Sequence, residues 1–289
     1  MINPILFGLA VVIWGSTWYA IEFQLGVVAV EVSLAYRYAM ATALAFGWCL
    51  VRRQSLRFGW VAHRYFLLMG LFLFGLNYLA AYFAQLYITS ALNAICFSAM
   101  VWMNIINARI FFGTRILRRT YAGAGLGLIG IIILFWPAVQ DISMSDGVLI
   151  GAGISLSGAL FASFGNIASQ AAQHRKIPVM PANAWGMLYG TLLNAGLALG
   201  LGRPFTFDFS PGYVISLLFL AVFGSVVAFA AYLYLLGRVG MERVGYAAVM
   251  VPIVALVISA LFEGLQLETH LYLGVGLALA GNVFILARR

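Results

Sequence analysis

Long apolar runs, separated by short charged or polar clusters, dominate this sequence. Dividing the chain at those clusters leaves ten segments of about 17 to 24 residues, and a helix needs about 20 to cross about 30 Å of hydrocarbon. The segments run approximately over residues 4–22, 32–51, 65–88, 91–112, 120–138, 147–168, 182–201, 213–236, 244–262 and 271–287. They lack the alternation of a barrel strand, and helices satisfy their own backbone in lipid. The sequence therefore predicts an all-α integral membrane protein with ten transmembrane helices.

Composition also indicates lipid rather than water as the solvent. Only 8% of the 289 residues are charged and the mean hydropathy is +1.02, whereas soluble domains have about 25% charged residues. Both cysteines, Cys49 and Cys96, fall inside apolar runs, where a free thiol behaves as a small hydrophobic group. We predict neither a disulfide nor a metal site. The first residues, Met1 to Pro4, contain no basic side chain, which predicts a retained helix rather than a cleaved signal peptide.

Basic residues are distributed unevenly between the loops, and their distribution predicts the topology. If the N-terminus is cytoplasmic, thirteen basic residues fall in cytoplasmic segments and one, Arg203, falls in an outer loop. The thirteen are Arg52, Arg53, Arg57, Arg64, Arg115, Arg118, Arg119, Arg175, Lys176, Arg238, Arg243, Arg288 and Arg289. Because cytoplasmic loops retain Lys and Arg, we predict a multi-pass protein of the cell (inner) membrane with both termini in the cytoplasm. The net charge of +8 reflects this topology and not a nucleic-acid partner.

Two further basic residues lie within predicted helices, where a central Arg costs roughly 2.5–3.5 kcal/mol on insertion scales. Arg109 is near the cytoplasmic end of its helix, so its side chain can extend to the interface. Arg37 lies about two turns below the outer end of its helix, where such extension is harder. Two interpretations of Arg37 stay open: an interhelical structural contact, and a role at the outer mouth of a site.

The chain carries an internal repeat with an offset near 150 residues. Residues 82–94 resemble residues 232–247, and glycines match in the same order along both halves. The matching glycines are Gly8 with Gly151, Gly15 with Gly158, Gly123 with Gly274, Gly125 with Gly276 and Gly130 with Gly281. Five helices is an odd number, so the second half must enter the membrane upside down. We predict one membrane domain with a first five-helix repeat over residues 1–140 and a second, inverted five-helix repeat over 141–289.

Short motifs in order along the chain carry a family resemblance. They are Trp14-Gly15, Arg37, Tyr87-Ile88-Thr89-Ser90-Ala91, Val249-Met250-Val251-Pro252-Ile253 and Phe262-Glu263. Together they resemble the drug/metabolite transporter superfamily, specifically its EamA-type branch, over essentially the whole chain. The resemblance implies ten helices in two inverted repeats, and a carrier of amino acids or other metabolites that often works as an exporter.

A polar face in the third predicted helix is the main candidate for substrate binding. Tyr78, Tyr82 and Gln85 recur at three- and four-residue spacing, so they share one side of the helix, with Asn77 beside them. Tyr commonly marks the headgroup region at helix ends, but these tyrosines lie well inside their segment. We favour cavity lining over hydrogen bonding between helices.

Weaker candidates lie in the other predicted helices. Large aromatic side chains at membrane depth more often pack against neighbouring helices than contact a substrate, so packing is the alternative for each of them. The further substrate-binding candidates are the aromatic residues Trp14, Trp18, Trp102, Phe161, Tyr232 and Tyr246, together with Ser98, which lies one turn before Trp102.

The sequence lacks the features of an ATP-driven pump and of an enzyme. It has no Gly-rich loop ending in Lys and Ser or Thr. No Asp, Glu or His lies near the centre of a predicted helix, where it could activate a serine. We predict no cofactor and no enzymatic activity.

The expected site is uncharged and aromatic, which suits neutral or zwitterionic solutes. We therefore predict a carrier of small neutral or zwitterionic metabolites in the lipid bilayer, with amino acid export by alternating access as the leading function. The alternative is a broad-specificity drug or toxic-compound exporter. Gly123 and Gly127 permit close helix packing, which also allows a homodimer seam.

Overall fold

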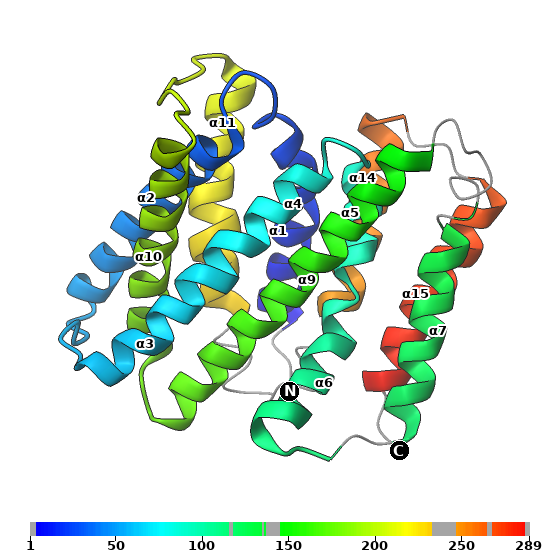
Figure 1. The fold of residues 1–289 in the computed structure, drawn as a ribbon, viewed down its shortest axis with the longest axis horizontal. Helices are drawn as coiled ribbons and strands as arrows, with labels where there is room; N and C mark the ends of the chain where they lie inside the picture. The colour runs from blue at the N-terminus through cyan, green and yellow to red at the C-terminus, as the bar shows by residue number, and fades with distance from the viewer. Residues whose placement is uncertain are drawn as a thin grey trace.

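A computed structural model describes residues 4–115, 118–134, 136, 145–232, 247–264 and 268–286. These residues are helical apart from short connections, and no strand occurs among them. The elements are α1 (Pro4–Glu22), α2 (Val30–Val51), α3 (Trp60–Met69), η1 (Gly70–Leu76), α4 (Asn77–Ala84), α5 (Ser90–Phe97), α6 (Met100–Phe112), α7 (Arg118–Leu134), α9 (Ser145–His174), α10 (Val179–Gly200), α11 (Pro211–Phe219), η2 (Leu220–Val227), α14 (Ala247–Phe262) and α15 (Thr269–Leu286). Successive helical runs alternate in direction through one bundle (Figure 1).

Length and apolar composition identify the helices able to cross a membrane. Six runs in the described ranges qualify: Ile5–Glu22, Val30–Val51, Trp60–Ala84, Ser90–Phe112, Gly147–His174 and Pro211–Tyr232. Shorter apolar helices cover Tyr121–Leu134, Met250–Phe262 and Thr269–Phe284. The all-helical class predicted from the sequence is confirmed, whereas ten crossings stay a prediction.

Local sequence explains where several helices begin and end. Thr89 and Ser210 precede α5 and α11, and each side chain accepts a hydrogen bond, 3.4 Å long, from the backbone N–H three residues later. Pro211 occupies the first turn of α11, where its missing N–H has no consequence. Gly113 ends α6 with φ +68°, a conformation that glycine adopts without a steric cost. The loops are thus specified by caps as well as by polarity.

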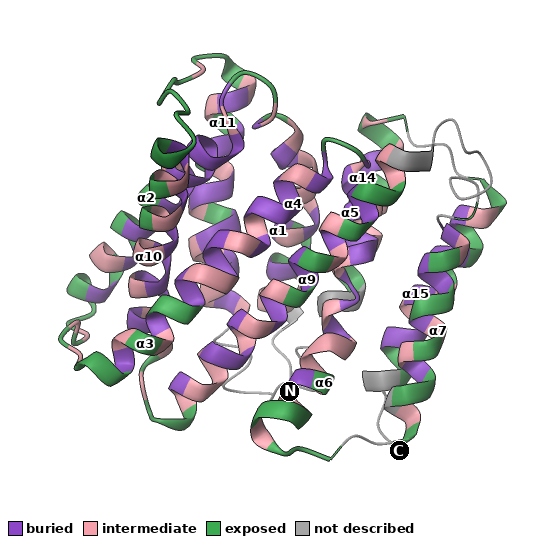
Figure 2. Ribbon diagram, in the orientation of Figure 1, coloured by how far each residue is buried: buried purple, intermediate pink, exposed green. Residues whose placement is uncertain are grey.

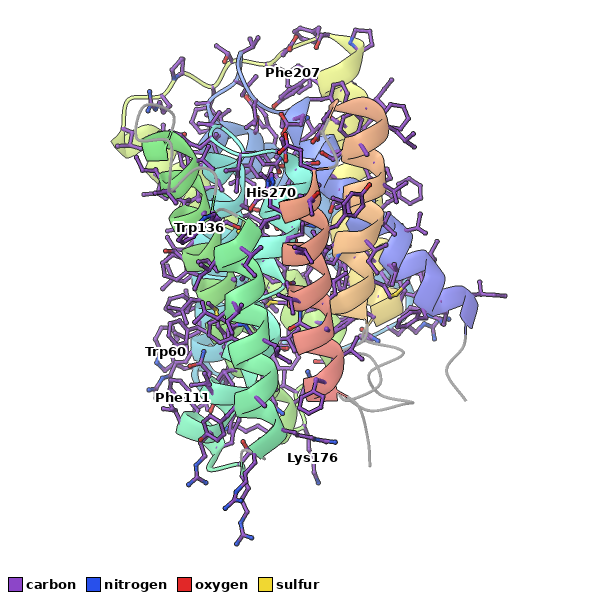
Figure 3. The ribbon with its side chains drawn as sticks, turned by 90° about the vertical axis from the view of Figure 1, so that its right-hand side faces the viewer. Trp60, Phe111, Trp136, Lys176, Phe207 and His270 are labelled. Atoms are coloured by element: carbon purple, nitrogen blue, oxygen red, sulfur yellow. The ribbon has the colours of Figure 1, made fainter. Side chains whose placement is uncertain are left out.

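The connections α2–α3, α6–α7 and α9–α10 lie at one end of the bundle, where α1 also begins (Figure 1). Together with the helix ends that flank them, these connections carry most of the described basic residues, Lys176 among them, whereas Phe207 and His270 lie at the opposite end (Figure 3). We call the two ends the predicted cytoplasmic end and the predicted outer end. The charge separation expected from the sequence is therefore present along the bundle axis.

Buried residues face the middle of the bundle and exposed ones its periphery (Figure 2). Many exposed side chains are large and apolar, such as Val51, Ile110 and Leu261. Lipid tails are as apolar as these groups, so such a periphery fits a membrane and not water.

The helices α7 and α15 form a close pair at one side of the bundle (Figure 1). A Cβ atom on Gly274 would lie 2.8 Å from the carbonyl oxygen of Gly130, so this approach requires glycine. A Cβ on Gly281 would likewise lie 2.6 Å from the backbone nitrogen of Gly127 and would also meet the backbone of Gly123. The close helix packing predicted for Gly123 and Gly127 therefore occurs within the chain, against α15, and a homodimer stays a prediction.

Two π-helical segments interrupt long helices. The segment η1 joins α3 to α4, and η2 follows α11. Their first residues, Gly70 and Leu220, lie 150 positions apart, which is the offset of the internal repeat. Within η2 the Ser225 hydroxyl donates to the Leu220 carbonyl oxygen at 3.0 Å, five residues back, as the wider turn allows. Such segments are rare and often occur at functional sites. Apolar periodicity gave no sign of them.

Candidate functional site

Arg37 of α2 is enclosed in the bundle, with only 1% of its surface exposed. Its Nε donates to the Ser225 hydroxyl at 3.2 Å and its Nη1 to the Tyr82 hydroxyl at 3.3 Å. The guanidinium carbon lies 4.5 Å from the ring centre of Tyr78 and 5.5 Å from that of Tyr38. Hydrogen bonds and ring faces both stabilise a buried cation. Arg37 therefore depends on α4 and η2 for its position.

No carboxylate among the described residues forms an ion pair with Arg37. A buried charge is usually paired with an opposite charge. The hydroxyl groups and rings around Arg37 leave it a net positive centre within the helices. With 1% of its surface exposed, Arg37 can meet a carboxylate from outside the protein only after the helices around it move apart.

The predicted polar face of the third transmembrane run is continuous in the structure. Tyr78 and Tyr82 contact Arg37, and Gln85, one turn further along, reaches α1. The Gln85 amide nitrogen donates to the Glu22 Oε1 at 2.6 Å and to the Trp18 carbonyl oxygen at 3.0 Å. This face, Tyr78–Tyr82–Gln85, therefore connects the buried arginine to an acidic side chain at the end of α1.

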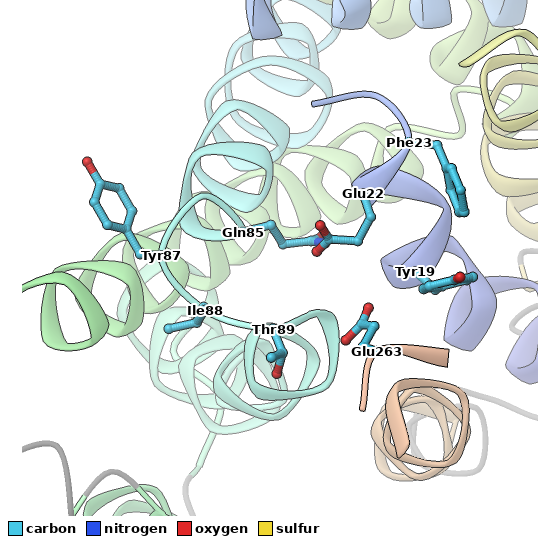
Figure 4. Close-up of a pocket in the computed structure, with 8 residues that line it drawn as sticks. All are labelled: Tyr19, Glu22, Phe23, Gln85, Tyr87, Ile88, Thr89 and Glu263. Atoms are coloured by element: carbon cyan, nitrogen blue, oxygen red, sulfur yellow. The ribbon is translucent and has the colours of Figure 1, made fainter. Parts of the chain in front are cut away.

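A pocket of about 530 Å³ opens beside Gln85 at the predicted outer end (Figure 4). It lies between the end of α1, the α4–α5 connection and the residue that follows α14 (Figure 4). Its lining residues are Tyr19, Glu22, Phe23, Gln85, Tyr87, Ile88, Thr89 and Glu263. We call this the acidic pocket. Its two carboxylates differ from the uncharged site that the sequence predicted.

Two buried acceptor atoms of the acidic pocket have no donor within the described residues. They are the Oε1 atoms of Gln85 and Glu263. The Gln85 nitrogen already faces two acceptors, the Glu22 carboxylate and the Trp18 carbonyl, so the orientation of this amide is fixed. The other oxygen of Glu263 accepts from the Ser259 hydroxyl. The pocket therefore offers acceptors that require a donor from a ligand or from water.

Trp14 and Tyr232 contact each other, with ring centres 5.1 Å apart, and the Trp14 indole nitrogen donates to the Gly224 carbonyl oxygen at 3.2 Å. The Trp18 ring packs on Phe97 at 5.2 Å. Both tryptophans thus make packing contacts on α1, and the backbone of Trp18 also holds Gln85.

Of the described candidate residues, only Gln85 lines the acidic pocket. Ser98 donates to the Ile95 carbonyl of its own chain segment at 2.7 Å, and Trp102 packs against a separate core cluster. Phe161 stacks on Phe72 with ring centres 6.2 Å apart. Tyr246 lies outside the described residues. The structure thus brings together the polar face of α4 and leaves these side chains elsewhere.

Sequence reasoning missed the two glutamates. Glu22 and Glu263 were assigned to the outer side as topology markers, and each stands at the end of a helix. Their convergence depends on packing between α1 and α14, where Gly15 contacts Val254 closely. Glu263 did belong to one of the family motifs, and this was the available signal. Because Glu22 and Glu263 are far apart in the sequence, their proximity in the fold could not be predicted from it.

The sequence profile of the EamA-like transporter family matches residues 2–136 and 149–287. The chain belongs to the EamA-like transporter family. It is therefore a transporter rather than an enzyme, and its apolar helices are those of a multi-pass membrane protein.

Three curated relatives are similar to this EamA-like chain. A "Probable amino-acid metabolite efflux pump" of Salmonella typhimurium is 28% identical over 209 residues, which cover 68% of this chain and 65% of the relative. The protein of the same name from Escherichia coli is 26% identical over 236 residues, covering 75% and 76%. An "Uncharacterized transporter" of Archaeoglobus fulgidus is 20% identical over 99% of both chains. The aligned part thus spans just under two thirds of the Salmonella protein.

A crystal structure at 17% sequence identity has the same fold. Its TM-score is 0.71, with 97% of this chain and 94% of the other covered. The whole described bundle thus corresponds to a known architecture.

Proposed function

We propose that this EamA-like transporter exports small neutral or zwitterionic metabolites, amino acids above all, by alternating access. The observation that carries the proposal is the polar face of α4, which has a buried cation at one end and the acidic pocket at the other. Three residues, a rise of roughly 4.5 Å along the helix, separate Tyr82 from Gln85. A zwitterion carries both complementary charges within a similar span.

The proposed architecture is ten transmembrane helices in two inverted halves, residues 1–140 and 141–289. Three observations support it. The family profile matches the chain in two consecutive segments. The helices α1 and α9, which open the two halves, begin at opposite ends of the bundle (Figure 1). The segments η1 and η2 occupy corresponding positions, 150 residues apart. Inverted halves allow a carrier to open to alternate sides of a shared site.

The names of the relatives support amino acid export as the direction and substrate class. Both bacterial relatives carry the words amino-acid metabolite efflux pump. The predicted location is the cell (inner) membrane with both termini in the cytoplasm, so that the acidic pocket faces the side to which an exporter releases its substrate.

A second candidate is a broad-specificity exporter of cationic drugs. The acidic pocket favours it, since Tyr19 and Phe23 stand beside Glu22 and Glu263 and aromatic rings attract organic cations. The two candidates differ in whether a substrate needs a carboxylate.

Counterflow in proteoliposomes tests the proposal. Vesicles are loaded with one unlabelled solute, and the same solute is added outside in radiolabelled form. The solutes tested in turn are a panel of amino acids and of aromatic cations that lack a carboxylate. We expect accumulation of at least one neutral amino acid and little accumulation of the cations. Accumulation of the cations alone would favour the drug exporter, and no accumulation of either class would contradict both candidates.

A further inference from the structure

We propose that the acidic pocket recognises a primary ammonium group through Glu22, Gln85 and Glu263. The inference rests on the proposed function, because the ammonium would belong to the transported solute. The pocket has two carboxylates, while its lining contains no Lys, Arg or His among the described residues. A ligand that neutralises it must be a cation.

The acceptors of the pocket define the kind of cation. Gln85 is deeply buried, with a relative exposure of 6%, and its Oε1 has no donor among the described residues. The Oε1 of Glu263 is in the same condition, and Figure 4 shows the side chains of Glu22, Gln85 and Glu263 converging on the same space. A primary ammonium carries three N–H donors and no acceptor. A quaternary ammonium carries none and would leave these oxygens unpaired, at a cost in free energy.

The walls of the pocket indicate what is attached to the ammonium. The Tyr19 ring lies 5.2 Å from Phe23, nearly perpendicular to it, and stacks on Phe262 at 5.5 Å. An apolar or aromatic group next to the amine would contact this wall. The volume of about 530 Å³ is within the range of small-molecule sites. A divalent metal ion fits less well, because Ca²⁺ and Mg²⁺ take six or more oxygen ligands and gain nothing from rings.

Direct binding tests the inference without requiring transport. The purified full chain in detergent is titrated calorimetrically at pH 7 with 2-phenylethylamine, its N-trimethyl analogue and 3-phenylpropionate. We expect only the primary amine to bind. Glu22→Gln and Glu263→Gln should each raise its Kd by about tenfold or more, since a charge-assisted hydrogen bond is lost.

A matched control is Glu268→Gln, which removes an exposed acid at the same end of the bundle. Glu268 pairs with His270 at 3.3 Å and does not line the pocket, so we expect an unchanged Kd. Size-exclusion profiles and unfolding temperatures establish that each variant is folded. Both pocket variants keep the shape of the side chain, and in Glu263→Gln the amide oxygen can still accept from the Ser259 hydroxyl.

Three outcomes would overturn the inference. They are equal binding of the trimethyl analogue, an unchanged Kd in both pocket variants, and an equal loss of binding in Glu268→Gln. The proposed function is tested separately. Binding of the amine without any counterflow would support the ammonium site and contradict the proposed transport. Counterflow that is unaltered in Glu22→Gln and Glu263→Gln would support the proposed transport and contradict the ammonium site.

Discussion

The surroundings of Arg37 and the acidic pocket are adjacent along α4 but differ in how their polar atoms are paired. Arg37 is enclosed by two hydrogen bonds and two ring faces, and it is almost inaccessible. Gln85 and Glu263 each have a buried oxygen without a donor among the described residues, beside the acidic pocket of about 530 Å³. A charged group that is enclosed by its partners holds its neighbours in place, whereas unpaired acceptors beside an open pocket can bind the donors of a ligand. The polar face of α4 thus has a closed end and an open end.

The largest effect is expected at the closed end, from Arg37→Met. An apolar residue of similar size can replace a buried charge with little loss of stability or even a gain. We expect an unfolding temperature within a few degrees of the native protein and counterflow reduced by about a hundredfold or more, because the proposed carrier exposes Arg37 to the substrate carboxylate when its helices move apart. Thermal unfolding in detergent and counterflow of the preferred amino acid measure the two quantities.

The same variant decides between the two interpretations of Arg37. If Arg37→Met unfolds much earlier while each folded molecule transports at the native rate, the arginine is only an interhelical contact. Arg37→Lys is the companion variant, since it keeps the charge but loses the planar group that stacks on Tyr78 and reaches both hydroxyls. We expect partial activity from it.

A smaller effect is expected from Tyr82→Phe, which removes the hydroxyl that accepts from Arg37 but keeps the ring. Hydrogen bonds to charged groups contribute about 1.5–3 kcal/mol, so counterflow should fall by about tenfold or more. Tyr121→Phe is the control, because Tyr121 is 65% exposed on α7. Equal rates for the two variants would show that the hydroxyl of Tyr82 does not position the arginine during transport.

The smallest effect on transport comes from cysteine variants that report which side each end faces. Both native cysteines, Cys49 and Cys96, are buried, so background labelling should be low. We expect Glu268→Cys to react with a membrane-impermeant maleimide in intact cells and Arg57→Cys to react only after the cells are opened. Transport should be unchanged in both. The reverse pattern would place the acidic pocket on the cytoplasmic side and contradict release through it.

Much of this arrangement follows from the sequence, for identifiable reasons. Lipid fixes the length of a helix, so apolar runs predicted the helical segments closely; the run predicted over 91–112 corresponds to α5 and α6, which together cover Ser90–Phe112 with a short break at Ser98 and Ala99. Helical spacing placed Tyr78, Tyr82 and Gln85 on one face, where the structure has them. These features depend on residues close together in the chain.

Other features depend on contacts between distant segments, and the sequence alone did not predict them. The acidic pocket needs Glu22 and Glu263, which are brought together by α1 and α14. The glycines of α7 were expected to permit close helix packing, and the helix they meet is α15 of the same chain; a glycine pattern does not say which helix approaches it.

The π-helical turns of η1 determine how every later residue of the run Trp60–Ala84 is rotated about the helix axis. One residue corresponds to about 100° of rotation in an α-helix. A regular helix from Trp60 to Ala84 would therefore swing Tyr78 and Tyr82 about a quarter-circle around the axis, away from the guanidinium group that they now enclose. Shortening Gly70–Leu76 by one residue would leave the membrane span almost unchanged in length while turning its aromatic face toward a different neighbour.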